Sequence, residues 1–289
     1  MKLNVALSGF LGILLAAVFG LVLNTFDTTL RSTVAVEQAT GISTISVISR
    51  ATVRGRRWPL ISLTPRAGWA EDCRQLRTQL LSQKPTPRSI LVTSENSGEG
   101  KSFTASNLSI ALALAGDSVI LVDGDMRTPA LHTVFDLPNR FGLSDALFTD
   151  DGSNPARLLT QTSVPNLRVV VAGEASGNPS DMLPSFKMLG LLEKLRPEAD
   201  FIIFDSPSMS LVPDAGILAR QADATLLVVE ANRTKHPDAI LAVNQLRHSG
   251  ANLIGVVFNK SRNWRRGTIW RPAFLSGTFP KKPSVLVRR

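Results

Sequence analysis

The sequence is poor in the side chains that make covalent cross-links and metal centres. It contains no tyrosine, one cysteine and three histidines among 289 residues. Without tyrosine, no tyrosine hydroxyl of this chain can be modified. The single cysteine, Cys73, excludes an internal disulfide and a cysteine-rich metal site, and it fits a reducing compartment. The histidines at positions 132, 236 and 248 lack the spacing of metal ligands, so we do not expect a zinc enzyme.

Length and charge limit the organisation further. With 44% hydrophobic residues the chain can form one sizeable domain with appendages, but it is too short for two large ones. The net charge of +9 is unevenly distributed: residues 50–88 carry nine Lys or Arg against two acids, and residues 260–289 carry nine and no acid. Two basic segments around an acidic core fit either nucleic acid or the anionic inner face of a membrane.

One uncharged run favours the membrane. Residues 5–23, VALSGFLGILLAAVFGLVL, contain no charge over 19 positions, which is about the length needed to cross a bilayer. We predict a membrane-spanning helix over residues 5–26. A cleaved secretory signal is the alternative, but the run is long for a signal and no small-x-small cleavage site follows. Arginines follow the run, which predicts a single-pass protein of the inner (plasma) membrane with its bulk in the cytoplasm. We do not expect nucleic acid as a partner.

The rest of the chain divides into three predicted segments. Residues 27–68 lack periodicity and contain TPRAG and RGRRWP, so we expect a juxtamembrane linker with at most short elements. Residues 69–262 form the compact domain, which begins with an amphipathic helix over residues 69–81. Residues 263–289 form a basic tail with interleaved Trp and Arg. This pattern is typical of a solvated, mobile end and also suits contact with anionic lipid.

Short apolar runs alternate with helical patterns beyond residue 88. Runs rich in Val, Ile and Leu, typical of strands buried on both faces of a parallel sheet, occur at residues 89–93, 118–122, 167–171, 200–204, 224–229 and 253–258. Helices are expected near residues 101–115, 183–195, 212–221 and 237–249. This βαβ progression predicts an α/β fold with a parallel sheet between two layers of helices.

A small polar loop, SENSGEGKS at residues 94–102, follows the first of these strands. Its glycines can turn backbone N–H groups toward phosphate oxygens, while Lys101 adds positive charge and Ser102 offers a hydroxyl to Mg²⁺. A strict P-loop has glycine where this chain has Glu95, but the position between a strand and a helix favours phosphate binding over a simple glycine turn. We expect nucleotide binding by Ser97, Gly98, Glu99, Gly100, Lys101, Ser102 and Phe103.

Three aspartates follow other strands of the predicted sheet. Asp123 and Asp125 flank a glycine in LVDGDMR, and Asp205 ends the strand in FIIFDSPS. Each alone fits a helix or turn cap. Together at the carboxyl edge of the sheet that carries the phosphate loop, they predict an ATP–Mg²⁺ site with Ser102, Asp125 and Asp205 as metal ligands. The candidate catalytic residues are Lys101, Asp123 and Asp125. Lys101 would stabilise transferred charge, and Asp123 would act as the base.

These motifs carry a resemblance to a known family. SGEGKS, ILVDGDMR and FIIFDSPS, in that order, resemble the Walker A, Walker A′ and Walker B motifs of the bacterial tyrosine kinases of capsule and exopolysaccharide assembly. That family belongs to the deviant P-loop group that includes MinD and ParA. AEDCRQLRTQL resembles its Glu-x-x-R helix, and GNPSDML resembles its Asn-Pro-Ser loop. The apolar segment after residue 4 is similar to the last membrane helix of its Wzz-type chain-length module.

The resemblance implies a MinD/ParA-like P-loop fold, with ATP and Mg²⁺ as cofactors and polysaccharide chain-length determinant and export proteins as partners. It also implies self-association into a homo-oligomer through the helix that carries Glu71 and Arg74. Asn259 matches a position from which relatives contact the base, although it also fits a simple turn residue. MinD and ParA relatives have a signature lysine where this chain has Asn96, so the kinase branch is favoured over a partitioning ATPase.

The missing tyrosine leaves the reaction open. Family members usually end in a tyrosine cluster that a neighbouring subunit phosphorylates, and this sequence has none. One possibility is a kinase that transfers the ATP γ-phosphate to a tyrosine on a separate protein. A second is an ATPase whose nucleotide cycle regulates polysaccharide polymerisation, and a third is a nucleotide-binding scaffold. The three retained aspartates favour catalysis.

Overall fold

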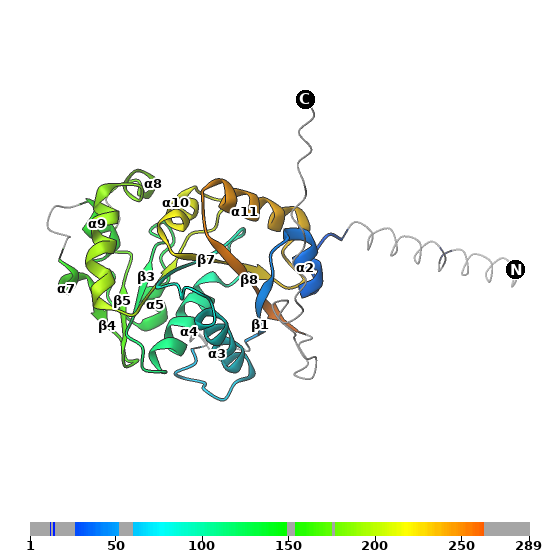
Figure 1. Ribbon diagram of the computed structural model, residues 1–289, viewed down its shortest axis with the longest axis horizontal. Helices are drawn as coiled ribbons and strands as arrows, with labels where there is room; N and C mark the ends of the chain where they lie inside the picture. The colour runs from blue at the N-terminus through cyan, green and yellow to red at the C-terminus, as the bar shows by residue number, and fades with distance from the viewer. Residues whose placement is uncertain are drawn as a thin grey trace, which may run out of the picture.

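An eight-stranded sheet with helices on both faces forms the centre of the molecule (Figure 1). The computed structural model describes residues 12, 14, 27–51, 60–148, 154–174 and 177–262. Within them the strand order is β1-β8-β7-β2-β6-β3-β5-β4, and every neighbouring pair is parallel except β4 with β5. The predicted α/β fold with a mostly parallel sheet is therefore confirmed.

All six strands expected from apolar runs are present. They are β2 (Ser89–Ser94), β3 (Val119–Asp123), β5 (Leu167–Val170), β6 (Phe201–Asp205), β7 (Ala224–Glu230) and β8 (Leu253–Ser261). Successive side chains of a strand point to opposite faces, and both faces are covered. In β2, for example, Ile90 and Val92 pack into one apolar cluster and Leu91 into the other. Burial on both faces explains why these runs are continuously apolar.

One face of the sheet is covered by α3 (Gly68–Leu81), α4 (Lys101–Ala113) and the short α5 (Leu131–Phe135). The expected helices at 69–81 and 101–115 thus form. Leu76, Leu80 and Leu108 are almost wholly buried in the same cluster as Ile90. This layer holds α4, and therefore the end of the phosphate loop, against the sheet.

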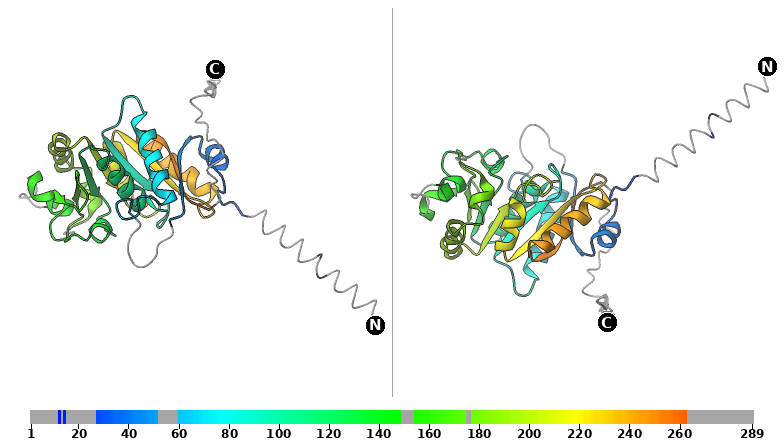
Figure 2. Two further views of the ribbon diagram at one scale, coloured as in Figure 1. Left: turned by 90° about the horizontal axis from the view of Figure 1, so that it is seen from below. Right: turned by 90° about the horizontal axis from the view of Figure 1, so that it is seen from above.

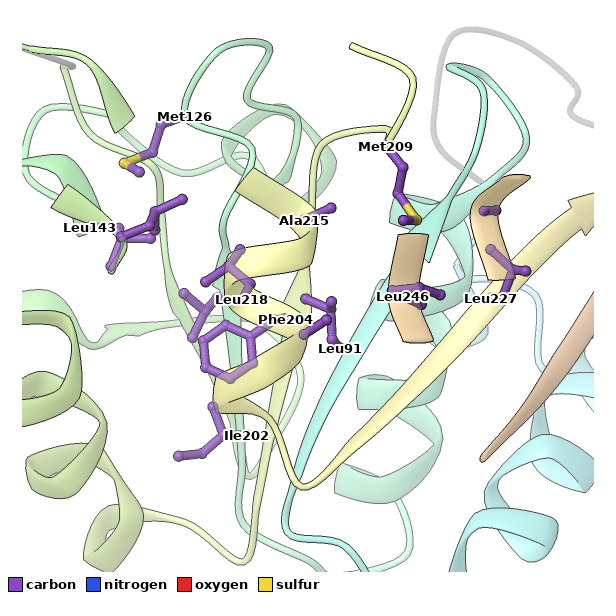
Figure 3. Packing of buried hydrophobic residues seen from close by; sticks show 14 of the residues in the cluster. Leu91, Met126, Leu143, Ile202, Phe204, Met209, Ala215, Leu218, Leu227 and Leu246 are labelled. Carbon is purple, nitrogen blue, oxygen red and sulfur yellow. The ribbon is translucent and has the colours of Figure 1, made fainter. Parts of the chain in front are cut away.

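The opposite face is covered by α6 (Leu143–Phe148), α9 (Phe186–Leu195), α10 (Asp214–Gln221) and α11 (His236–His248), as the two views of Figure 2 show. In the core, Phe204 and Ile202 of β6 lie against Leu218 of α10 (Figure 3). The remaining short elements are α7 (Pro155–Leu158), β4 (Thr160–Gln161), α8 (Pro179–Met182) and η2 (Arg196–Glu198).

The segment 27–68, expected to be a linker, contributes two elements to the domain. They are α2 (Thr33–Thr40), which packs against α11, and β1 (Thr44–Ser49), which pairs with β8 at the edge of the sheet. Ile45 and Ile48 of β1 are buried. The sheet therefore begins before residue 69, where the sequence placed the start of the domain.

Strands were predicted from continuous apolar runs, and β1 was missed because Ser and Thr interrupt its run, TISVIS. Two polar groups of this strand, one hydroxyl and one backbone N–H, are satisfied by contacts with Asp72 of α3. The Ser46 hydroxyl donates to the Asp72 carbonyl (3.4 Å), and the Ser49 N–H donates to Asp72 Oδ2 (2.9 Å). A buried polar group that is hydrogen-bonded in this way costs little, so the strand can be buried despite its composition.

The expected membrane helix over residues 5–26 lies, apart from residues 12 and 14, outside the described residues, and the basic tail at 263–289 lies wholly outside them. None of the helices in the described part of the chain combines the length and the apolar character needed to cross a bilayer.

Candidate nucleotide-binding site

The phosphate loop runs from the end of β2 to the start of α4 and contains two left-handed glycines. Gly98 has φ +82° and Gly100 has φ +102°, a region of backbone conformation that favours glycine. A Cβ on Gly100 would also lie 2.0 Å from Nδ2 of Asn259. The loop can therefore adopt this shape only with glycine at position 100.

A cavity of about 520 Å³ opens beside this loop. Its size is within the range of small-molecule sites, roughly 300–1,000 Å³. The cavity is lined by Arg50, Ala51, Ser97, Gly98, Gly100, Lys101, Ser102, Phe103, Thr128, Ala130, Asn259 and Lys260. Free N–H groups of the first turn of a helix attract phosphate, and α4 begins at this cavity with Lys101. The structure thus brings together all but one of the residues expected to bind the nucleotide.

The exception is Glu99, whose side chain is buried next to Asn96 and Thr234. The Thr234 hydroxyl donates to Glu99 Oε1, and the Asn96 N–H donates to Oε2 (3.0 Å). Burial raises the pKa of Glu99, although the hydrogen bonds from Thr234 and Asn96 oppose that effect. The Glu99 side chain therefore fixes the loop from behind and does not line the cavity.

The end of β8 holds the loop from another side. Asn259 Nδ2 donates to the Glu99 carbonyl (2.9 Å), and Asn259 is almost wholly buried. Lys260 Nζ donates to the Gly98 carbonyl (2.6 Å) and pairs with Glu230 Oε2 (2.9 Å). Asn259 thus has a structural role in addition to its place in the cavity wall.

The two aspartates after β3 are held by the turn that follows them. Asp123 is fully buried, and its Oδ2 accepts the N–H groups of Ala130 (3.1 Å) and Leu131 (2.9 Å). Asp125 accepts both the N–H and the hydroxyl of Thr128, each at 3.0 Å. Asp125 Oδ2 also lies 3.7 Å from Lys101 Nζ. The turn therefore places Asp125 beside the phosphate-loop lysine and Asp123 deeper in the protein.

Asp205 lies directly beside this pair, because it is the register partner of Asp123 between β6 and β3. Burial raises the pKa of both carboxyls. The charge of Asp205 raises the pKa of Asp123 further, whereas Lys101 and the Ser102 side chain lower the pKa of Asp205. In the part of the chain that the structure describes, neither Asp205 oxygen has a hydrogen-bond partner of ordinary geometry. Such a buried, unsatisfied carboxylate needs a further partner.

A hydrated Mg²⁺ ion fits that need. Mg²⁺ is usually bound by one or two carboxylates together with water and substrate phosphates. Among the described residues, no group of three or more His, Cys, Asp or Glu side chains could hold a metal by itself. The arrangement of Ser102 and Asp205 therefore suits a hydrated ion that arrives with a nucleotide.

Sequence reasoning missed five residues of the cavity wall: Arg50, Ala51, Thr128, Ala130 and Lys260. Arg50 and Ala51 follow β1, so they could not be assigned while that segment was interpreted as a linker. Lys260 could have been predicted to line the site, because it is a cation directly after the candidate nucleotide contact Asn259. The remaining two, Thr128 and Ala130, belong to the turn that binds the aspartates.

Comparison with known proteins now places the chain in a family. Residues 90–276 match the family model described as the CobQ/CobB/MinD/ParA nucleotide binding domain. The tyrosine-protein kinase YwqD of Bacillus subtilis is 33% identical over 203 residues, which cover 69% of this chain and 85% of YwqD. The chain belongs to the bacterial tyrosine kinase family. EpsB of Ralstonia nicotianae is 31% identical to this chain over 272 residues. The match covers 89% of this chain and 36% of EpsB.

A solved structure supports the same assignment. The crystal structure of the chimerical protein CapA2B2 superimposes with a TM-score of 0.73 at 28% identity, covering 80% of this chain and 100% of that one. The expected MinD/ParA-like P-loop fold is confirmed. In this family member Asn96, at the position of the signature lysine of the MinD and ParA branch, donates instead to Asp238 Oδ2 of α11 (3.1 Å).

Proposed function

We propose that this protein is an ATP- and Mg²⁺-dependent protein tyrosine kinase of capsule or exopolysaccharide biosynthesis. It transfers the γ-phosphate of ATP to a tyrosine of another polypeptide, because its own sequence contains none. One observation carries the proposal: the phosphate loop with Lys101 and the unsatisfied carboxylate of Asp205 lie at the same edge of the sheet. The similarity of this chain to tyrosine-protein kinases supports the choice of reaction.

The roles follow from where charge develops during phosphoryl transfer, which depends mainly on positioning and electrostatic stabilisation. Lys101 and the N–H groups at the start of α4 bind the phosphate oxygens. Ser102, Asp205 and Asp125 are the proposed ligands of Mg²⁺ and its water shell, and the ion would neutralise charge on the phosphates. Asp123 is the proposed base because it lies opposite Asp205 at the same edge of the sheet, where a bound cation would favour its charged, proton-accepting form. Ser97, Gly98, Gly100, Phe103 and Asn259 shape the nucleotide cavity.

We further propose that the domain works at the inner face of the plasma membrane. The uncharged run at residues 5–23 supports a single-pass anchor. Similarity to the chimerical protein CapA2B2 supports a CapA-type membrane partner, within a set of chain-length and export proteins. Glu71 and Arg74 form an ion pair (2.9 Å) on α3, with a half-exposed Glu71 side chain available to a second copy of the chain.

The decisive experiment incubates the full chain in membranes or detergent with labelled ATP, Mg²⁺ and a synthetic Glu–Tyr copolymer. Phosphotyrosine on the copolymer that disappears with Lys101→Met, and persists with the exposed control Lys84→Met, supports the kinase. Free phosphate alone would indicate an ATPase that regulates polymerisation. Bound ATP with neither product would indicate a scaffold.

A further inference from the structure

The guanidinium of Arg127 joins three segments that are far apart in the sequence. Its Nε donates to Asp214 Oδ2 (3.0 Å). Its Nη2 donates to Asn178 Oδ1 (3.0 Å) and to Ser180 Oγ (2.9 Å). One planar side chain thus connects the turn after β3, the Asn-Pro-Ser segment at the start of α8 and the first residue of α10.

Asp214 makes this connection depend on the positive charge. Its side chain is 1% exposed, one oxygen accepts from Arg127, and the other accepts from the Ser180 hydroxyl. A carboxylate buried to this extent needs a well-oriented cation, and a planar guanidinium provides more than one hydrogen bond in fixed directions. The Arg127 side chain is 38% exposed, so its outer edge remains accessible to solvent.

The backbone of Arg127 belongs to the turn that holds the catalytic carboxylates. Thr128, the next residue, donates twice to Asp125, and Ala130 and Leu131 donate to Asp123. The Arg127 side chain itself is not among the residues that line the nucleotide cavity. It is therefore able to fix the turn from outside without touching the nucleotide.

The segment before Asp214 is attached to the phosphate loop at its other end. After Asp205 the chain passes through Met209 and Ser210, whose N–H groups donate to the carbonyls of Ser94 and Glu95, each at 3.0 Å. The same stretch therefore contacts the base of the phosphate loop and, through Asp214, the Arg127 guanidinium. This stretch therefore connects the phosphate loop with the turn that holds Asp123 and Asp125.

We propose that Arg127 is a positioning residue for phosphoryl transfer. Its hydrogen bonds to Asp214, Asn178 and Ser180 hold the 123–131 turn, so that Asp125 stays beside Lys101 and Asp123 stays beside Asp205. This inference rests on the proposed kinase function. Because Arg127 itself lies outside the nucleotide cavity and acts only through the turn, its loss lowers the rate of the chemical step much more than it lowers nucleotide affinity. A displacement of about 1 Å in such a site can cost on the order of 100-fold in rate.

The test uses three variants of the full chain. Arg127→Lys keeps the charge and removes the planar fork. The double variant Arg127→Gln with Asp214→Asn removes both buried charges together, so that no unpaired carboxylate prevents folding. Arg140→Lys, at an exposed position, is the matched control. For each protein we would measure the affinity for Mg-ADP, the thermal midpoint, and kcat and KM for copolymer phosphorylation.

We expect both Arg127 variants to lower kcat by at least about 10-fold while the Kd for Mg-ADP changes by less than about 3-fold. The inference is overturned if kcat is unchanged, or if affinity falls in parallel with kcat.

A second measurement separates this inference from the proposed function. If the wild-type chain transfers no phosphate to tyrosine, the kinase proposal fails, and Arg127 is then judged by the rate of ATP hydrolysis and by amide hydrogen exchange. Arg127→Lys should speed the exchange of the Thr128, Ala130 and Leu131 amides, which donate to the two aspartates. Unchanged exchange at those amides would contradict the positioning role, whatever the reaction is.

Discussion

Asp123 and Asp205 lie opposite each other on the neighbouring strands β3 and β6, and neither is exposed to solvent. Burial disfavours the charged form of each carboxyl and raises both pKa values, and the charge of Asp205 raises the pKa of Asp123 further. The domain therefore keeps an unfavourable arrangement that a bound cation would relieve.

Replacing Asp205 by Asn should stabilise the nucleotide-free domain at high pH. A carboxyl with a raised pKa in the folded state keeps a proton that the unfolded chain releases near pH 4, so stability falls as pH rises from about 4 to the raised pKa. At pH 8 the gain should be roughly 1–3 kcal/mol, and it should shrink at pH 5. Urea unfolding at both pH values measures it, with the exposed Asp181→Asn as control. An equal effect of Asp205→Asn at both pH values would contradict the titration.

Binding of Mg-ADP at pH 7 should release protons. The cation favours the charged form of Asp205, which is partly protonated in the free domain, so about one proton or less leaves per domain. Calorimetric titrations in two buffers of different ionisation enthalpy give the number. Asp205→Asn should release fewer protons, and the same release from both proteins would assign it to other groups.

Gly100→Ala should abolish nucleotide binding. An added Cβ would lie 2.0 Å from Asn259 Nδ2, so Asn259 would lose its bond to the Glu99 carbonyl and the loop would shift. Gly116→Ala is a close control, because Gly116 has a similar φ of +108° with no atom within 4 Å of the added Cβ. Both variants carry backbone strain of about 1 kcal/mol. Equal nucleotide affinity in the two variants would show that the contact with Asn259 does not matter.

Ile48→Ala should destabilise the whole domain. Ile48 is fully buried in β1, and removing its side chain leaves a cavity that costs roughly 2–5 kcal/mol. Val34→Ala is the control, since Val34 is 58% exposed on α2 and should change stability by less than about 0.5 kcal/mol. Denaturant unfolding of both proteins decides whether β1 is part of the cooperative unit, and a small effect of Ile48→Ala would mean that it is not.

The pattern of apolar residues in the sequence predicted the inner strands of the sheet, but it did not predict the edge strand β1. β2 and β6 are continuous apolar runs because both of their faces are covered, and such runs are visible in the sequence. β1 is buried with Ser and Thr in it, and Asp72 on α3 accepts hydrogen bonds from the Ser46 hydroxyl and the Ser49 N–H. No sequence window that contains β1 shows this contact, since Asp72 is 23 residues away from Ser49.

The site shows the same limit. The roles of Lys101, Ser102 and the aspartates could be predicted from short motifs. A glycine-rich loop with lysine and serine, followed by carboxylates at later strand ends, is typical of phosphate and Mg²⁺ binding. The orientation of Glu99 depends on Thr234, 135 residues later. The hydrogen bond from Lys260 Nζ to the Gly98 carbonyl joins residues that are 162 positions apart. Such contacts are determined by how the strands are arranged in the sheet, and spacing in the sequence does not indicate them.

The contact between Gly98 and Lys260 also bears on how the protein is made. The phosphate loop leaves the ribosome before β8, but its carbonyls at positions 98 and 99 have their side-chain donors in that strand, the last one described. The wall of the cavity that contains Asn259 is missing until that strand has been synthesised. A nascent chain therefore cannot complete the nucleotide site until residue 260 has emerged, and a bound nucleotide can stabilise the domain in this form only after that point.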